Sequence, residues 1–268
     1  MEIIIILFVF LFGLIIGSFL NVVIFRYNTG LGIGGRSRCL SCGRRLGFLD
    51  LFPVASFVFF GGKCRTCKAK ISWQYPLVEL TCGLFFVLAY LKFGLSIELY
   101  FVLVSFFLLL AIAVYDLKHK IIPDGLVFAF IFVSILKMLE RNYLGGIGFD
   151  FNFLDLFSGL ILATPFALIF FLSGGKWMGF GDAKLALGIG WFLGLYSGLN
   201  ATIISFWIGA VVSLGLLLIQ KIFPKGFPLK FGGDKLTIKS EIPFAPFLIL
   251  GMLLQIFYQF DFFHVFFI

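Results

Sequence analysis

The chain has 268 residues, of which 61% are hydrophobic and only 13% are charged. Water-soluble domains average about 25% charged residues, so this composition excludes a soluble globule and predicts an integral membrane protein. A formal net charge of +8 would suggest nucleic acid as the partner of a soluble protein. In a membrane protein such charge gathers on the cytoplasmic side, so we expect membrane lipid and no nucleic acid as a partner.

The first apolar run, residues 3–25, lacks the basic start and the small-residue cleavage site of a signal peptide. We interpret residues 1–25 as a retained first membrane helix. Seven further apolar runs approach the roughly 20 residues that span a bilayer. They fall at 76–93, 98–115, 121–138, 153–173, 183–196, 199–220 and 244–267. The sequence thus predicts an all-α polytopic membrane protein with about eight transmembrane helices, the sixth of them short enough to be re-entrant or tilted.

Basic residues indicate the orientation of these spans. Segment 26–74 carries nine Lys or Arg residues and one acid, Asp50, which predicts a cytoplasmic location. Alternating eight spans from there puts both termini outside and leaves only three basic residues there: Lys92, Lys137 and Arg141. The Lys-rich loop 221–241 is then cytoplasmic, and we expect it to contact anionic lipid headgroups.

Two cysteine pairs lie in the large cytoplasmic segment. CLSC and CRTC form a C-x2-C, 21-residue gap, C-x2-C pattern, close to the spacing of four-cysteine zinc sites. The predicted metal ligands are Cys39, Cys42, Cys64 and Cys67. Segment 26–74 has few core residues, so it needs a metal or disulfides to fold, and four thiolates can close a structural zinc site. Two disulfides are the alternative, although the cytoplasm is reducing.

The stretch MGFGDAK, residues 178–184, places one acid beside glycines in apolar surroundings. Carboxylates in or near lipid are costly and mark functional sites. Asp182 begins the sixth predicted span, and Asp116 ends the third at the same membrane face. Two such carboxylates can share a proton, so that one acts as a base toward water and the other as an acid toward the leaving amine. The pair predicts aspartyl proteolysis with Asp116 and Asp182 as catalytic residues.

Several neighbouring residues allow more than one interpretation. We expect Gly179 and Gly181 to let the backbone approach a substrate strand and adopt conformations that other residues resist. An ordinary turn with Asp182 as a helix N-cap is the alternative. Asp124 is expected to cap a helix or contact substrate, and Lys184 either anchors the chain at the interface or tunes Asp182.

Other hydrolytic chemistries find less support in the sequence. His119 and His264 are expected to lie far apart, and neither G-x-S-x-G nor HExxH occurs. We interpret His119 as a solvated loop residue. The fifth cysteine, Cys82, lies in an apolar run and fits as a small buried residue.

In their order, the motifs resemble those of the bacterial type IV prepilin peptidases, which are intramembrane aspartyl proteases of the GxGD type. The resemblance covers almost the whole chain. The matching stretches are GSFLNVVIFR at 17–26, ISWQYPLVE at 71–79, YDLKHKIIPD at 115–124, MGFGDAKLALG at 178–188 and IPFAPFL at 242–248. The chain departs from the family at LDLFPVAS, residues 49–56, where the family more often has Asn and a small aliphatic residue before the proline.

The resemblance implies two activities at the cytoplasmic face of the bacterial inner membrane. Asp116 and Asp182 map onto the acids that cut the basic leader of type IV prepilins and pseudopilins after a glycine. The new N-terminal residue, often Phe, is then methylated with S-adenosylmethionine. The cysteine region accompanies the methylating form of the family, so 26–74 is expected to belong to the methyltransferase region and 75–268 to form the peptidase domain. No motif marks the S-adenosylmethionine site; Glu79 is a candidate polar contact near the membrane.

Two other classes of function remain as alternatives. An ion- or proton-coupled transporter also uses paired membrane acids and glycine-interrupted helices. Both predicted acids, however, lie at one membrane face and not at the midplane. An assembly scaffold could use the cysteine module for docking, and it would keep its function when Asp116 or Asp182 is replaced by Asn.

Overall fold

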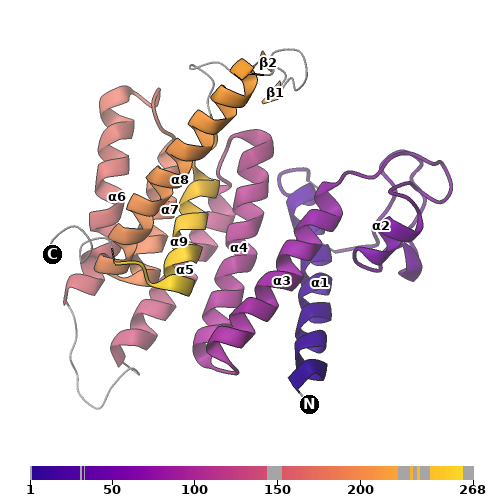
Figure 1. Cartoon of the computed structure of the whole chain (residues 1–268), viewed down its shortest axis with the longest axis horizontal. Coiled ribbons are helices and arrows are strands. Elements are labelled where there is room, and N and C mark those ends of the chain that lie inside the picture. Colours follow the sequence, from indigo (N-terminus) through magenta and orange to yellow (C-terminus); the bar gives the residue numbers. More distant parts are fainter. Residues whose placement is uncertain are drawn as a thin grey trace. The chain divides into compact units, whose positions relative to one another are not determined.

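The computed structural model describes residues 2–30, 32, 34–143, 153–222, 230–231, 234–235 and 242–261. Helices dominate these residues, as predicted (Figure 1). They are α1 (Glu2–Arg26), α2 (Ala55–Phe59), α3 (Gln74–Phe93), α4 (Ile97–His119), α5 (Asp124–Tyr143), α6 (Phe153–Ser173), α7 (Phe180–Leu193), α8 (Leu195–Ile222) and α9 (Ala245–Tyr258), with a 3-10 turn, η1 (Phe48–Asp50), before α2. Strands β1 (Lys230–Phe231) and β2 (Asp234–Lys235) form a short antiparallel pair that the sequence did not predict.

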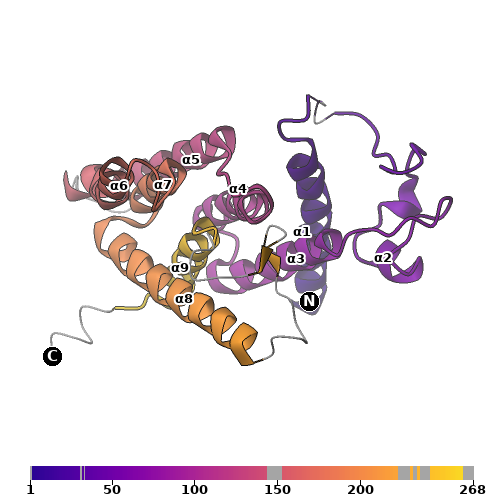
Figure 2. The same ribbon diagram turned by 90° about the horizontal axis from the view of Figure 1, so that it is seen from above.

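The chain forms two compact units, Met1–Ala111 and Ile112–Ile268, which divide inside α4. In the first unit, α1 and α3 lie side by side, and the loop that carries α2 extends from them (Figures 1 and 2). Their contact is close because glycines line it. A Cβ atom at Gly13 would lie 2.8 Å from the Cα of Gly83, and one at Gly17 would lie 2.8 Å from the Cα of Glu79. Small residues four positions apart allow this close approach of membrane helices.

The second unit is built around α7, which contacts α5, α6, α8 and α9. Figure 2 shows α7 between α5 and α6. Glycines again allow the contacts: a Cβ atom at Gly188 would lie 2.6 Å from the ring of Phe130, and one at Gly190 would lie 2.6 Å from the carbonyl oxygen of Ser158. Most residues of α7 are buried, so this helix is enclosed by protein and presents little surface to lipid.

Five of the described helices are long and apolar enough to cross a membrane: α1, α3, α4, α6 and α8. The other three predicted spans also form helices, but α7 and α9 have only 14 residues each. At 1.5 Å per residue these reach about 21 Å, less than the hydrocarbon core of about 30 Å. Residues 262–267 of the last predicted span lie outside the described residues. Length and composition therefore establish a multi-pass protein without establishing eight full spans.

Charges near the end of α5 explain why this helix fails as a simple apolar span. Lys137 pairs with Glu140 at 2.8 Å, and Arg141 pairs with Asp155 of α6 at 3.0 Å. Arg141 also donates a hydrogen bond of 3.0 Å to the carbonyl oxygen of Phe192 near the end of α7. The guanidinium thus ties together the ends of three helices, and its charge is matched inside the unit.

The glycine contact between α1 and α3 can be tested by overpacking it. We expect Gly17→Leu to lower the free energy of unfolding by about 1–3 kcal/mol, because the added side chain meets the backbone of α3. Thermal unfolding of the purified protein in detergent measures the loss. Gly215→Ala in α8 is the control, since a Cβ atom there meets nothing within 4 Å. Equal midpoints for the two variants would contradict the close packing.

Candidate functional site

The two predicted acids lie at helix ends in the second unit. Asp116 is in the last turn of α4, and Asp182 is in the first turn of α7. Both are buried, with 5% and 8% of their surface exposed. The carboxylates lie close enough to interact electrostatically. The structure therefore brings together two side chains that are 66 positions apart in the sequence.

Backbone N–H groups face both carboxylates. The N–H of Ala245 donates to the carboxylate of Asp116, and the N–H of Gly179 donates to that of Asp182. Ala245 is fully buried and begins α9, so the N-termini of α7 and α9 both point their positive dipole ends at the acids. Ala245 has no side-chain group that would mark this role in the sequence. The Pro at the start of α9 is the available signal, because proline favours the first turn of a helix.

The glycines beside Asp182 have different neighbours from those we expected. A Cβ atom at Gly181 would lie 2.8 Å from the Cβ of Ile122, in the turn between α4 and α5. The absence of a side chain at Gly181 thus leaves room for the turn between α4 and α5 of the same chain. Gly179 has φ −75° and ψ 148°, which any residue can adopt, and a Cβ atom there would lie 3.7 Å from the carboxylate of Asp182. Neither glycine has a positive φ, so the expectation of special backbone conformations was wrong.

Asp124 and Lys184 form an ion pair with each other, a contact that the sequence did not predict. Asp124 is the first residue of α5, and its carboxylate accepts a 2.6 Å hydrogen bond from the Lys184 ammonium. The same ammonium lies 5.4 Å from the ring centres of Phe128 and Phe180. The pair joins the start of α5 to the first turns of α7.

The histidines are not part of this cluster as far as the structure describes them. His119 ends α4, is exposed, and lies with its ring 4.4 Å from that of Tyr115. His264 lies outside the described residues, as do most residues of the loop 221–241. Cys82 is fully buried in α3, as predicted.

The four cysteines of the first unit gather into one cluster. The sulfur atoms of Cys39, Cys42, Cys64 and Cys67 all lie within 4.8 Å of one another. Those of Cys39 and Cys67 are 3.8 Å apart, about the edge length of a zinc tetrahedron with bonds of about 2.3 Å. A disulfide requires about 2.05 Å. The cluster therefore fits a thiolate-bound metal better than it fits two disulfides.

Two equivalent turns present the cysteines. The backbones of Arg38 and Arg45 form an antiparallel β-bridge around the first turn, and those of Lys63 and Lys70 form one around the second. In each turn, the N–H of the first cysteine donates to a carbonyl five residues on, at 2.9 Å. The backbone N–H of Cys42, followed by that of Ser41, lowers the pKa of the Cys39 thiol to about 6. At Cys39 the turn thus favours the thiolate form that binds metal. At Cys67, the backbone N–H of Ala69 is outweighed by desolvation and the neighbouring cysteine side chains, which raise the pKa to about 11.

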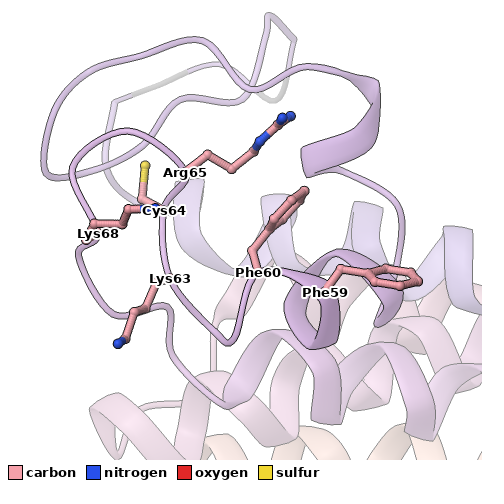
Figure 3. A pocket seen from close by; sticks show the side chains of 6 residues that line it. All are labelled: Phe59, Phe60, Lys63, Cys64, Arg65 and Lys68. Atoms are coloured by element: carbon pink, nitrogen blue, oxygen red, sulfur yellow. The ribbon is translucent and has the colours of Figure 1, made fainter.

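Basic residues surround the cluster. Arg44 donates a 2.7 Å hydrogen bond to Thr66 and pairs with Asp50, so it joins the two turns. A hollow of about 290 Å³ lies beside the cluster, lined by Phe59, Phe60, Lys63, Cys64, Arg65 and Lys68. Figure 3 shows Arg65 beside Phe60, with its guanidinium 4.8 Å from the ring centre. Among the described residues that line the hollow, none is acidic, so they include no acid–base pair.

Two family models match the chain, and they divide it close to the boundary between the two compact units. A family model described as "Bacterial Peptidase A24 N-terminal domain" matches residues 11–93. A second, described as "Type IV leader peptidase family", matches residues 101–214. The first range contains the cysteine cluster, and the second contains Asp116 and Asp182. No solved structure matches the chain.

Curated relatives match over most of their length. The prepilin leader peptidase/N-methyltransferase of Bacillus subtilis (strain 168) is 33% identical over 254 residues, which cover 93% of this chain and 92% of the relative. The protein of the same name from Dickeya chrysanthemi is 30% identical over 250 residues, covering 83% and 86%. The one from Pseudomonas aeruginosa is 28% identical over 276 residues, covering 88% and 93%.

The contact of Gly181 with Ile122 predicts unequal effects of alanine at the two glycines. Gly181→Ala should lower the thermal midpoint, because its Cβ atom would overlap that of Ile122. Gly179→Ala should leave the midpoint within about 1 °C of wild type, since its Cβ atom makes only an ordinary contact. A larger loss at Gly179 than at Gly181 would contradict the described approach of α7 to the turn.

The cysteine cluster predicts one bound metal ion per chain. Elemental analysis of the purified protein should find one zinc, and Cys64→Ser should reduce metal binding at least about tenfold. Cys82→Ala is the matched control and should retain the metal, because Cys82 lies in α3 outside the cluster. Metal retained by Cys64→Ser but lost from Cys82→Ala would overturn the assignment.

Proposed function

This chain belongs to the type IV leader peptidase family, and on that premise we propose that it cleaves the leader from type IV prepilins or pseudopilins and N-methylates the new N-terminus. The observation that supports the peptidase activity is that Asp116 and Asp182 are both buried at the ends of α4 and α7, close enough for their carboxylates to interact electrostatically. The methyltransferase activity rests on the similarity to relatives named for both reactions.

The geometry supports hydrolysis by the two acids. One carboxylate removes a proton from a water molecule, whose oxygen then attacks the carbonyl carbon of the residue before the cut. The other, protonated, donates its proton to the carbonyl oxygen. When the tetrahedral intermediate collapses, the first acid passes the proton it took from water to the leaving amine, and the second takes back the proton of the hydroxyl group. The peptide bond breaks, and the water supplies the new carboxylate oxygen. The helix N-termini near Ala245 and Gly179 stabilise negative charge on the carboxylates through their N–H groups.

The site suits a substrate that is part leader and part membrane helix. Asp116 and Asp182 lie at the ends of helices, where an apolar substrate helix would meet water. Under the positive-inside rule, the basic segment 26–74 is cytoplasmic, and alternating spans put both acids at the same face. The proposed location is therefore the cytoplasmic face of the bacterial inner membrane, with cleavage after a glycine.

The cysteine cluster is proposed to hold zinc. Cys39, Cys42, Cys64 and Cys67 supply four sulfur ligands, which leave no open coordination position for catalysis. The cation then links two turns that have little apolar core of their own, and nearby arginines offset the thiolate charge. We assign it a structural role in the proposed methyltransferase region.

S-adenosylmethionine is the proposed methyl donor, and it supplies an electrophilic methyl group on a sulfonium. The donor carries no phosphate, so its binding does not depend on a glycine-rich phosphate loop. The first unit offers a buried carboxylate, that of Glu79, and carboxylates suit cationic reactants. The residues of this unit are thus compatible with methyl transfer from a sulfonium.

Transport and scaffolding explain less of the site. An ion pathway needs acids along the membrane depth, whereas both acids here lie in the terminal turns of α4 and α7. A scaffold does not require two carboxylates to be buried together at the cost of their mutual repulsion. Hydrolysis by a carboxylate pair accounts for both observations.

Replacing either acid tests the peptidase activity. Asp116→Asn and Asp182→Asn should each slow cleavage of a prepilin by about 10²–10⁴-fold, because each removes a proton-transfer group. Intact mass spectrometry of a prepilin incubated with the purified protein measures the rate. Asp124→Asn is the control, because it alters an exposed acid near the site and should cost less than about tenfold. Full cleavage by Asp116→Asn or Asp182→Asn would reject the mechanism.

A further inference from the structure

A third buried carboxylate lies outside the proposed peptidase site. Glu79 of α3 is only 7% exposed and faces α1, where the Cα of Glu79 meets Gly17. It accepts a 2.8 Å hydrogen bond from the backbone N–H of Val54 and another from the hydroxyl of Ser18. Within the described part of the chain, no Lys or Arg forms an ion pair with it. Buried carboxylates are normally paired with a cation, and Glu79 has no such cation among the described residues.

The donor that now faces Glu79 belongs to a strained turn. Val54 has φ 58° and ψ −50°, and the N–H of Ala55 donates to the carbonyl of Pro53 at 2.5 Å. This is the rare γ-turn of positive φ, and a β-branched residue there is a marked exception. Such strain costs on the order of 1–3 kcal/mol. A ligand that replaced the Val54 N–H would allow this turn to relax.

A buried polar atom without a partner lies one helical turn away. Asn21 of α1 is 1% exposed, and its amide nitrogen donates to the carbonyl of Tyr75 at 3.1 Å. Its Oδ1 atom has no hydrogen-bond partner among the residues that the structure describes. Tyr75 and Glu79 are four residues apart on α3 and share one face. The phenol of Tyr75 interacts electrostatically with both Glu79 and Cys39, so this polar site adjoins the cysteine module.

We infer that Glu79 binds the α-amino group of the cleaved substrate and holds it as the methyl acceptor, with the N–H of Val54 displaced. The orphan Oδ1 of Asn21 offers a second acceptor for an N–H of the same segment. This inference rests on the methyltransferase activity of the proposed function and adds the residue that recognises its substrate. The ligand class is a primary amine at the end of an apolar peptide.

The charge changes during methyl transfer favour the amine over the sulfonium as the partner of Glu79. The ammonium first gives a proton to the carboxylate, which passes it to solvent. The nitrogen lone pair then forms the N–C bond while the C–S bond breaks and its electrons remain on sulfur. Positive charge therefore grows on nitrogen and disappears from sulfur. A carboxylate beside nitrogen stabilises the transition state, whereas one beside sulfur stabilises only the reactant.

A binding cycle without methyl donor tests the inference on the full-length protein in detergent. The probes are a peptide with the apolar N-terminal sequence of a mature pilin, starting with Phe and a free amine, and the same peptide N-acetylated. Wild type should bind the free amine at least about tenfold more tightly than the acetylated peptide, as expected for a buried charge pair. Glu79→Gln should reduce this ratio to within about twofold, while Glu79→Asp should retain part of it.

Leu80→Ala is the matched control, because it shortens an exposed neighbour of Glu79 on α3 and leaves the carboxylate and its hydrogen bonds in place. It should lower the free-amine preference by less than about threefold. With S-adenosylmethionine added, Glu79→Gln should raise the KM for the peptide and leave the KM for the donor unchanged. A preserved free-amine preference in Glu79→Gln, or a rise in the KM for the donor alone, would overturn the inference.

Wild-type protein provides a second measurement that does not depend on folding of the variants. A carbodiimide joins a carboxylate to a nearby amine as an amide and is itself converted to a urea. Mass spectrometry should find the free-amine peptide attached to Glu79; attachment only at other acids would contradict the assignment. A separate outcome concerns the proposed function itself: if wild type adds no methyl to the peptide, N-methylation fails, whereas the binding cycle still decides the role of Glu79.

Discussion

The structure of the second unit depends on the burial of two carboxylates next to each other. Two like charges in a low-dielectric interior repel, and each loses its hydration, so the surrounding protein must compensate. The N-termini of α7 and α9 direct N–H groups at Asp182 and Asp116. This requirement is consistent with the enclosure of α7 by other helices, because a helix that begins with a buried acid needs protein around it and not lipid.

Much of this arrangement could be predicted from the sequence because its signals are local. The spacing of the four cysteines predicted their cluster, and the apolar runs predicted where helices lie. Charge asymmetry of the loops predicted that Asp116 and Asp182 would share one face, which is consistent with their proximity in the structure.

Features that depend on tertiary contacts could not be predicted in the same way. The neighbour of Gly181 is Ile122, and only the packing of α7 against the turn after α4 reveals it. The N–H of Ala245 reaches Asp116 across 129 sequence positions. Almost every residue has a backbone N–H, so the residue type does not reveal which of these groups faces the acid. The strained turn at Val54 was equally hidden, although the family departure at residues 49–56 had marked this stretch as unusual.

Each of the two units buries carboxylates, and we propose a different chemical role for those of each unit. In the second, two carboxylates lie together, and their proximity suits them to exchange protons with water and a peptide bond. In the first, Glu79 lies alone, and its isolation suits it to hold a cation. The cysteine cluster lies in the same unit as this acid, and we propose that a metal links its two turns, because a segment with little apolar core needs a covalent or metal link to become ordered. Burial is common to both sites, and the number of carboxylates decides the chemistry.

The central claim is that Asp116 and Asp182 face each other across the ends of α4 and α7. The most direct measurement joins Asp116→Cys and Asp182→Cys in one chain, treats membranes with a short thiol cross-linker, and identifies linked peptides by mass spectrometry. A control chain combines Asp116→Cys with Asp155→Cys, which lies at the start of α6, where Arg141 ties it to the far end of α7. We predict a link between positions 116 and 182 and none between 116 and 155. If positions 116 and 182 each react with a small alkylating reagent but never link to each other, the acids do not form a pair.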